Sequence, residues 1–368
     1  MITSLRVYFS AAISLLVLLL NASGCSDLVG SKEKSKHVFA PPYFGVNLSG
    51  GEFNTKALPG KFNVDYTFPS TSDVDYFSSK GMTIFRLPFR WERLQQEMYA
   101  ELDPLQLERI DQLVDHIANL DALVILNPHN FSRYYGDVIG TSEVPVEAFK
   151  DFWTKLANHY KNNSRVIFGL MNEPFGMSSE LWRDNANSAI AAIRAADADN
   201  LILVPGNGYS GAASWHSDWY GTPNATTILT IVDPIDNYAI EVHQYLDADS
   251  SGTSQDCVSA NIGVERLIKF TGWLREHQKK GFLGEFGAAN NDTCHQAMSN
   301  LLAYINENLD VWIGWTWWSA GPWWGNYPYS IQPAEGKGKP QMKWLEKSMS
   351  EANSQDVATG NNGGPNDL

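Results

Sequence analysis

Residues 166–174 read Val-Ile-Phe-Gly-Leu-Met-Asn-Glu-Pro, an apolar run that ends on the carboxylate of Glu173. Residues 281–287, Gly-Phe-Leu-Gly-Glu-Phe-Gly, repeat this arrangement and place Glu285 at the end of a second apolar run. Each run has the composition of a buried β-strand. A carboxylate at the rim of an apolar core is costly unless it has partners or a function. The two glutamates are far apart in the chain, so they can meet only if both strands share one sheet.

The rest of the chain repeats one unit, a short apolar strand followed by an amphipathic helix. The predicted strands cover residues 44–48, 83–88, 123–128, 166–172, 201–205, 238–243, 282–285 and 311–317. Helices are predicted over residues 104–120, 146–160, 179–196, 262–279, 294–309 and 340–348. Near-continuous apolar strands are typical of parallel sheets buried on both faces. Eight such units predict an α/β fold, a (β/α)8 TIM barrel that forms a single catalytic domain.

The sequence disfavours two alternatives to this architecture. The chain has 368 residues, a length that often means two domains, but no Gly-, Ser- or Pro-rich linker interrupts residues 43–347. An open, doubly wound sheet would be expected to carry a Gly-rich phosphate-binding loop after its first strand. Residues 49–51, Ser-Gly-Gly, are too weak a match to such a loop. The single barrel is therefore the preferred fold.

Charge and composition indicate which classes of molecule the protein can bind. The net charge is −14 and the sequence pI is about 5.0, which argues against a nucleic-acid-binding protein because such proteins need a basic surface. The chain contains 13 Trp, 15 Tyr and 17 Phe. Sugar rings present apolar C–H faces that stack on aromatic rings, so this content suits a carbohydrate-binding surface. The alternative is that the aromatic residues only fill a large core.

The two ends of the chain are predicted to lie outside the barrel, which we place at residues 41–349. Residues 1–24 combine Arg6, an apolar run from residue 7 to residue 20 and small residues, as in a secretory signal peptide. The small residues directly before Cys25 are typical of a bacterial lipoprotein, whose Cys is lipidated, although Ala22 stands where a Leu is usual. An ordinary signal peptide is the alternative. Residues 25–40 are predicted to form a polar tether, and residues 350–368 a disordered tail.

The remaining cysteines are Cys257 and Cys294. In a secreted chain such a pair suggests a disulfide, and two free buried thiols are the alternative. No Cys or His spacing typical of a zinc site is present, and the chemistry suggested below needs neither a metal nor another cofactor.

Polar and aromatic residues recur at the C-terminal end of every predicted strand. In a (β/α)8 barrel these ends form the catalytic face. Any one of them has a structural explanation, but a set at the same topological position indicates a site. Two carboxylates that face each other in such a site are typical of enzymes that cleave glycosidic bonds. The set comprises Asn47, Arg86, His129, Asn130, Asn172, Glu173, Asn207, His243, Tyr245, Glu285, Trp317 and Trp318.

The ordered set Arg86, His129, 172–174 (Asn-Glu-Pro), His243, Tyr245, Glu285 and Trp318 resembles glycoside hydrolase family 5, the cellulase A family of clan A. The resemblance spans about residues 43–347. The segments 206–209, 243–247, 250–253 and 317–324 are similar to its endo-β-1,4-glucanase branch. That branch also carries a cysteine pair at places similar to Cys257 and Cys294, which favours the disulfide.

The resemblance implies a role for each residue. Glu173 would be the general acid/base and Glu285 the nucleophile of a retaining mechanism, with carboxyl groups ~5–5.5 Å apart. Arg86 and Tyr245 would keep Glu285 ionised. Other residues would contact the sugar or orient the carboxylates: Asn172 at the 2-hydroxyl, His129 and His243 in the cleavage subsite, and Trp318 as the stacking floor beneath the sugar. Trp317 is the competing choice for the stacking floor, because adjacent strand residues point to opposite faces and only one of the two can face the sugar.

The resemblance also implies a substrate. An endo-β-1,4-glucanase acting on cellulose or mixed-linkage β-glucan is the leading hypothesis, and mannan, xyloglucan or β-1,3-glucan are alternative substrates of the same fold. A glycan-binding lipoprotein without catalysis is disfavoured because both glutamates are present. We further expect a secreted monomer. A lipid anchor would hold it at the bacterial outer membrane or cell surface and would be its only link to a membrane. Five further aromatic residues have two possible roles, either to stack on sugar units of the substrate or to pack the loops that carry them. They are Tyr209, Trp215, Trp219, Trp323 and Trp324.

Overall fold

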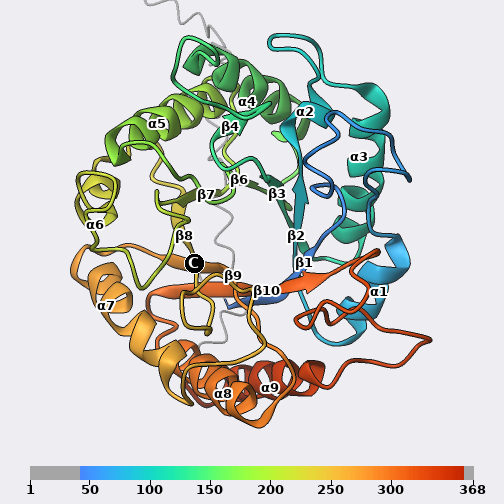
Figure 1. The fold of residues 1–368 in the computed structure, drawn as a ribbon, viewed down its shortest axis with the longest axis vertical. Coiled ribbons are helices and arrows are strands. Elements are labelled where there is room, and N and C mark those ends of the chain that lie inside the picture. The colour runs from blue at the N-terminus through green and yellow to red at the C-terminus, as the bar shows by residue number, and fades with distance from the viewer. Residues whose placement is uncertain (1–41, 360–368) are drawn as a thin grey trace, which may run out of the picture. The chain divides into compact units, whose positions relative to one another are not determined.

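The computed structural model describes residues 42–359, of which eight parallel strands form a closed barrel (Figure 1). Around the barrel the strands follow the order β1-β10-β9-β8-β7-β6-β3-β2. The single TIM-barrel domain predicted from the sequence is thus confirmed. The bounds are β1 Tyr43–Leu48, β2 Ile84–Phe89, β3 Leu123–Pro128, β6 Val166–Gly169, β7 Ile202–Pro205, β8 Tyr238–His243, β9 Gly281–Glu285 and β10 Trp312–Ala320.

Helices surround the barrel and separate successive strands, as Figure 1 shows. Five of the six predicted helices begin within two residues of their predicted start and end within three residues of their predicted end. The sixth, α9, runs further and is treated below. The bounds are α3 Pro104–Asn119, α4 Val146–Tyr160, α5 Ser179–Ala195, α7 Ile262–Glu276, α8 Asp292–Asn306 and α9 Gln341–Thr359.

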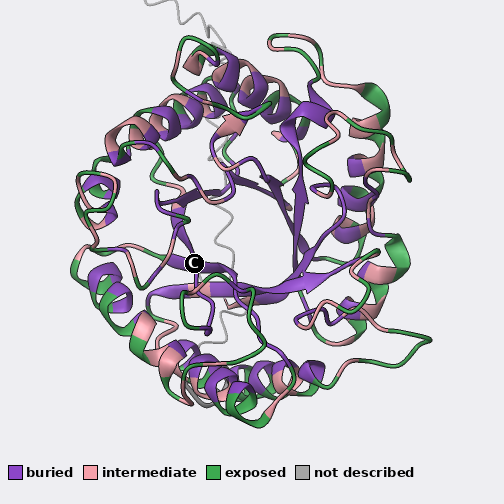
Figure 2. Ribbon diagram, in the orientation of Figure 1, coloured by how far each residue is buried: buried purple, intermediate pink, exposed green. Residues whose placement is uncertain are grey.

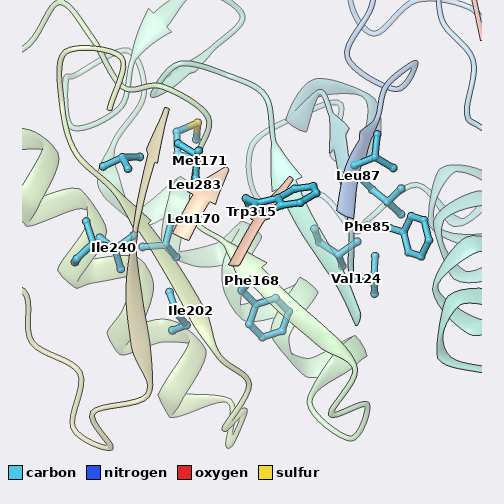
Figure 3. Packing of buried hydrophobic residues seen from close by; sticks show 14 of the residues in the cluster. Phe85, Leu87, Val124, Phe168, Leu170, Met171, Ile202, Ile240, Leu283 and Trp315 are labelled. Carbon is cyan, nitrogen blue, oxygen red and sulfur yellow. The ribbon is translucent and has the colours of Figure 1, made fainter. Parts of the chain in front are cut away.

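Successive side chains of each strand point to opposite faces, so the core is divided into two regions. Phe85, Leu87 and Val124 belong to the large cluster that packs between the strands and the helices (Figure 3). Their neighbours Ile84 and Ile125 belong to a small separate cluster that fills the inside of the barrel. The strands are buried along nearly their whole length, whereas the helices bury one side only (Figure 2). Strand residues that point inward near the C-terminal rim are therefore the ones available for chemistry.

Several short elements were missed by the sequence analysis. Helix α1 carries a capping box in which the Ser70 side chain accepts from the Asp73 amide and the Asp73 side chain accepts from the Ser70 amide. It is only nine residues long and mostly polar, so its apolar periodicity is weak. The missed elements are α1 Thr71–Ser79, α2 Trp91–Leu94, β4 Arg133–Tyr134, β5 Asp137–Val138, α6 Asn224–Thr227 and the 3-10 turn Ile228–Thr230.

The predicted disordered tail needs correction. Helix α9 continues to Thr359, ten residues past the predicted end of the barrel domain at residue 349. Leu345, Met349 and Ala352 recur at helical spacing, and all three are buried. Ala352 is a weak apolar signal in a polar stretch, which is why the sequence analysis ended the helix too early. Residues 360–368 lie outside the described part of the chain.

Cys257 and Cys294 form the predicted disulfide, with their Cα atoms 5.2 Å apart. The bond joins the long segment between β8 and α7 to the first turn of α8. The predicted signal peptide, Cys25 and the predicted tether fall outside the described residues. Within residues 42–359, no helix is both long and apolar enough to cross a membrane.

Candidate active site

Arg86 organises the C-terminal rim of the barrel. It lies in β2, two residues after Ile84, so its side chain also points inward, and it is fully buried. Its Nη1 donates to Asn47 at 2.8 Å and to Glu285 Oε1 at 2.9 Å. Its Nη2 donates to Asn172 Oδ1 at 2.8 Å and to Asn127 Oδ1 at 3.1 Å. One guanidinium therefore connects Asn47, Asn127 and Asn172, which come from three other strand ends, to the catalytic candidate Glu285.

The two predicted catalytic glutamates face each other at this rim. One oxygen of Glu173, one of Glu285 and a ring nitrogen of His243 all lie within 4.8 Å of one another. Glu173 follows β6 in a left-handed backbone conformation, with φ of 43°. Such a conformation is unfavourable for a non-glycine residue and is often found where a side chain must be aimed at a reaction centre.

Donors surround both carboxylates. Tyr245 Oη donates to Glu285 Oε2 at 2.9 Å, opposite the bond from Arg86. The Tyr245 ring lies directly above Gly252, where a Cβ atom would come within 2.7 Å of it, so this position has to be glycine. His243 Nδ1 lies 2.6 Å from Glu173 Oε1 and 3.5 Å from Glu285 Oε2. Arg86 and Tyr245 thus occupy the places expected for groups that stabilise an ionised nucleophile.

Burial and charge set the protonation of these groups. Burial opposes the charged form of His243, but Glu285, Glu173 and Glu241 together raise its pKa to about 10. Burial raises the pKa of Glu285, against the opposing effects of His243 and Arg86. Burial and the neighbouring Glu285 raise the pKa of Tyr245 well above its usual value. Tyr245 is therefore a neutral phenol that can only donate its proton to the carboxylate.

His129 and Trp318 form the wall next to the carboxylates. Their rings are stacked, with centroids 5.3 Å apart and planes inclined by 18°. Burial, Arg86 and Arg90 lower the pKa of His129 well below its ordinary value, so this histidine is neutral. Its Nδ1 has no hydrogen-bond partner among residues 42–359.

Trp317 does not belong to this wall, and its prediction as a substrate contact needs correction. Its side chain is fully buried, packs edge-to-face on Phe286 and donates its indole N–H to the Tyr329 carbonyl at 2.8 Å. Trp317 points out of the barrel toward the helices, whereas Trp318 points toward His129. This is the opposite-face relation of adjacent strand residues, and it leaves Trp318 as the candidate floor.

We expect alanine substitutions of the two tryptophans to have different consequences. Trp317→Ala should lower the free energy of unfolding by about 3–5 kcal/mol because it empties a packed site. Trp318→Ala should lower kcat/KM on cello-oligosaccharides by about 10-fold or more, with a smaller loss of stability. Denaturant titrations and initial rates on both variants provide the measurement. Equal effects of the two substitutions on both quantities would contradict the assignment.

The other aromatic candidates divide between surface and core. Trp215 is fully buried against Phe270 and Trp273, so it is a packing residue. Trp219, Trp323 and Tyr209 are exposed by 69%, 52% and 45%. Tyr209 stacks on Phe175, two residues after Glu173, at 4.5 Å. Trp324 is half-buried and meets the Trp318 ring at 5.8 Å.

The sequence analysis missed a fully buried carboxylate in this network, that of Glu241. Glu241 lies in β8 two residues before His243, and its Oε1 is 2.9 Å from Arg86 Nε. The contact is an ion pair rather than a well-aligned hydrogen bond. A glutamate at an inward position of the apolar segment 238–243 was a visible signal. The predicted set took His243 and Tyr245 from this strand and the residues after it, and it did not include Glu241.

Glu52 is a second missed carboxylate, in the loop after β1. Its Oε2 accepts the Gly50 amide at 2.7 Å. Burial raises its pKa to about 7, partly offset by backbone hydrogen bonds from Gly50 and its own amide. Arg90 also lies at this side of the rim and donates to the His129 carbonyl. Of these two residues, Arg90 is the one that contacts His129.

Three of the site's groups are close enough to be considered as metal ligands, namely Glu173, His243 and Glu285. However, Arg86 already supplies a buried cation 2.9 Å from Glu285, and His243 carries a second positive charge. An additional cation would be repelled by both, so we assign no metal to this cluster.

A barrel whose rim joins two facing glutamates, an arginine and a stacking tryptophan defines a glycoside hydrolase. A sequence model described as cellulase (glycosyl hydrolase family 5) matches residues 46–321. Endoglucanase gh5-1 of Neurospora crassa is 42% identical over 298 residues, which cover 80% of this chain and 74% of that protein. The chain therefore belongs to glycoside hydrolase family 5.

Solved structures give the same result. An endo-β-1,4-glucanase of Xanthomonas axonopodis pv. citri carrying a triple mutation is 50% identical, with a TM-score of 0.83 over 84% of this chain and 99% of that one. XacCel5A in complex with cellopentaose is 49% identical, with a TM-score of 0.82 over 84% of this chain and 99% of that one.

Proposed function

We propose that the protein is a retaining endo-β-1,4-glucanase that hydrolyses internal bonds of cellulose or mixed-linkage β-glucan by double displacement. The observation that carries the proposal is the close approach of Glu173 and Glu285, with one oxygen of each within 4.8 Å. Retaining enzymes place their carboxyl groups only ~5–5.5 Å apart, whereas inverting enzymes leave ~6.5–9.5 Å for a water molecule.

In the first step Glu285 attacks the anomeric carbon while Glu173 donates a proton to the leaving oxygen. The bonds from Arg86 and Tyr245 hold Glu285 in place for this attack. When the glycosyl-enzyme forms, Glu285 loses its negative charge. Glu173 has by then given up its proton and can act as the base of the second step.

In the second step Glu173 takes a proton from water, and the resulting hydroxyl attacks the anomeric carbon and releases Glu285. Asn172 supports both steps. Its Oδ1 accepts from Arg86 at 2.8 Å, which orients the amide, and its buried Nδ2 has no partner among the described residues. This N–H group is free to donate to the sugar 2-hydroxyl, a contact that strengthens in the transition state.

The β-1,4-glucan specificity is supported by relatives, since Neurospora and Aspergillus proteins at 40–42% identity are named endoglucanases. The cellopentaose bound by XacCel5A has the same backbone. Mannan, xyloglucan and β-1,3-glucan stay as alternative substrates. We further propose that the enzyme is secreted and monomeric, with Cys25 as its lipid anchor.

The test is hydrolysis of carboxymethyl-cellulose by the purified enzyme, followed by viscosity and by reducing ends. An endo-acting enzyme should lower the viscosity steeply while few reducing ends have formed. Proton NMR of cellopentaose hydrolysis should show the β-anomer first, as retention requires. No release from folded protein, together with activity on mannan, xyloglucan or β-1,3-glucan, would contradict the glucanase proposal. An α-anomer formed first would contradict retention.

A further inference from the structure

Glu241 lies beneath Glu173 and Glu285, between the cationic side chains of Arg86 and His243. Its Oε1 is 2.9 Å from Arg86 Nε and 3.5 Å from His243 Nε2. The side chain is completely buried. Gly284 in the adjacent strand β9 makes room for it, because a Cβ atom there would come within 2.2 Å of Glu241 Oε1. A space this specific indicates that the carboxylate is required at this point.

We propose that Glu241 is a positioning residue for hydrolysis. Its carboxylate fixes which nitrogen atoms Arg86 and His243 turn toward Glu285 and Glu173. This inference rests on the glycosidase function proposed above. Glu241 does not touch the reacting atoms, since it lies on the far side of both neighbours.

The effect on Arg86 follows from the fork geometry of a guanidinium. With Nε held against Glu241, the two Nη groups must point the other way, toward Glu285 and Asn172. A planar group with one edge fixed has little freedom to rotate. Glu241 therefore orients the two Nη groups that hold the nucleophile and the amide for the 2-hydroxyl.

The effect on His243 concerns its proton. The titratable groups that face this ring are Glu173 from the end of β6, Glu285 from β9, Glu241 from β8 and the neutral His129 from the end of β3. The three carboxylates favour the doubly protonated imidazolium, although burial opposes it. Glu241 is the one of the three that faces Nε2.

The charge of His243 matters because its Nδ1 lies 2.6 Å from Glu173. An imidazolium can only donate at Nδ1, so it cannot take the proton that Glu173 must give to the leaving oxygen. A neutral ring with a free Nδ1 would accept that proton instead. Removal of the Glu241 charge lowers the pKa of His243, so this competition should begin at a lower pH.

The test combines nitrogen NMR with pH–rate profiles. The ring nitrogens of His243 are followed in ¹⁵N-labelled enzyme, with the signal assigned by its absence in His243→Asn. In wild type both nitrogens should be protonated at pH 7. In Glu241→Gln the midpoint of the His243 titration should fall by about one pH unit or more. The alkaline limb of kcat/KM should shift to lower pH by a similar amount, and kcat should fall by about 10-fold or more.

Two further variants separate positioning from folding. Glu241→Asp keeps the charge and should restore the His243 titration and the alkaline limb. Asp233→Asn removes another buried carboxylate, one that binds Arg194 at 2.8 Å, and should change neither quantity. A wild-type His243 that is neutral at pH 7, an unshifted limb in Glu241→Gln, or the same shift in Asp233→Asn would each overturn the proposal.

If Glu241→Gln does not fold, a wild-type His243 that is neutral at pH 7 would still overturn the proposal. The NMR titration also needs no substrate. A wild type that hydrolyses no glycan would therefore refute the proposed function, while the His243 titration would still decide whether Glu241 controls its proton.

Discussion

Glu285→Gln is expected to lower kcat on β-1,4-glucans by about 10⁴-fold or more, with little change in substrate binding. Glutamine keeps the shape of the side chain, but its single amide oxygen can accept from only one of Arg86 and Tyr245, and it cannot form the glycosyl-enzyme. Reducing-end assays on carboxymethyl-cellulose measure the loss. Residual activity within 10-fold of wild type would mean that Glu285 is not the nucleophile.

Azide distinguishes the two glutamates. In Glu285→Ala, azide can enter the vacated space and attack the anomeric carbon of an activated cellobioside directly, which gives the α-glycosyl azide. In Glu173→Ala, Glu285 still forms the glycosyl-enzyme, and azide then attacks that intermediate to give the β-glycosyl azide. Proton NMR of the products reports the configuration. The reverse pattern would exchange the two roles, and no azide product from either variant would contradict double displacement.

Arg86→Met is expected to lower the free energy of unfolding by about 3–5 kcal/mol and to abolish activity. Methionine fills much of the space but removes the nearer of the two cations beside the carboxylates of Glu241 and Glu285, which are buried at 0% and 4% side-chain exposure. The stability loss should be larger at pH 8 than at pH 5, because the stranded carboxylates can be protonated at low pH. Urea unfolding of both proteins at the two pH values measures it.

Arg275→Met is the matched control for this substitution. Arg275 pairs with Asp310 at 2.8 Å, but both side chains are about half exposed. Its removal should cost about 1 kcal/mol or less, with activity unchanged. If Arg275→Met destabilises the protein as much as Arg86→Met, burial of the ion pair is not the cause.

Much of the fold could be read from the sequence because buried parallel strands have a simple pattern. The segments 123–128 and 238–243 are bounded as predicted, since their apolar runs end at polar residues or turns. Short or mostly polar elements could not be found in this way. Helix α1 depends on its cap, and the end of α9 depends on contacts that Ala352 makes only in the folded chain.

The sequence by itself determined the barrel and the rim positions of Glu173 and Glu285, because the alternation of strands with helices along the chain and the ends of the strands are local features. Only the tertiary structure decided which side chains contact one another at the rim. It turned Trp318 toward His129 and Trp317 into the core, and it placed Glu241 between Arg86 and His243. These relations depend on the register between the successive strands β8, β9, β10, β1 and β2, which brings together side chains that the chain itself keeps far apart.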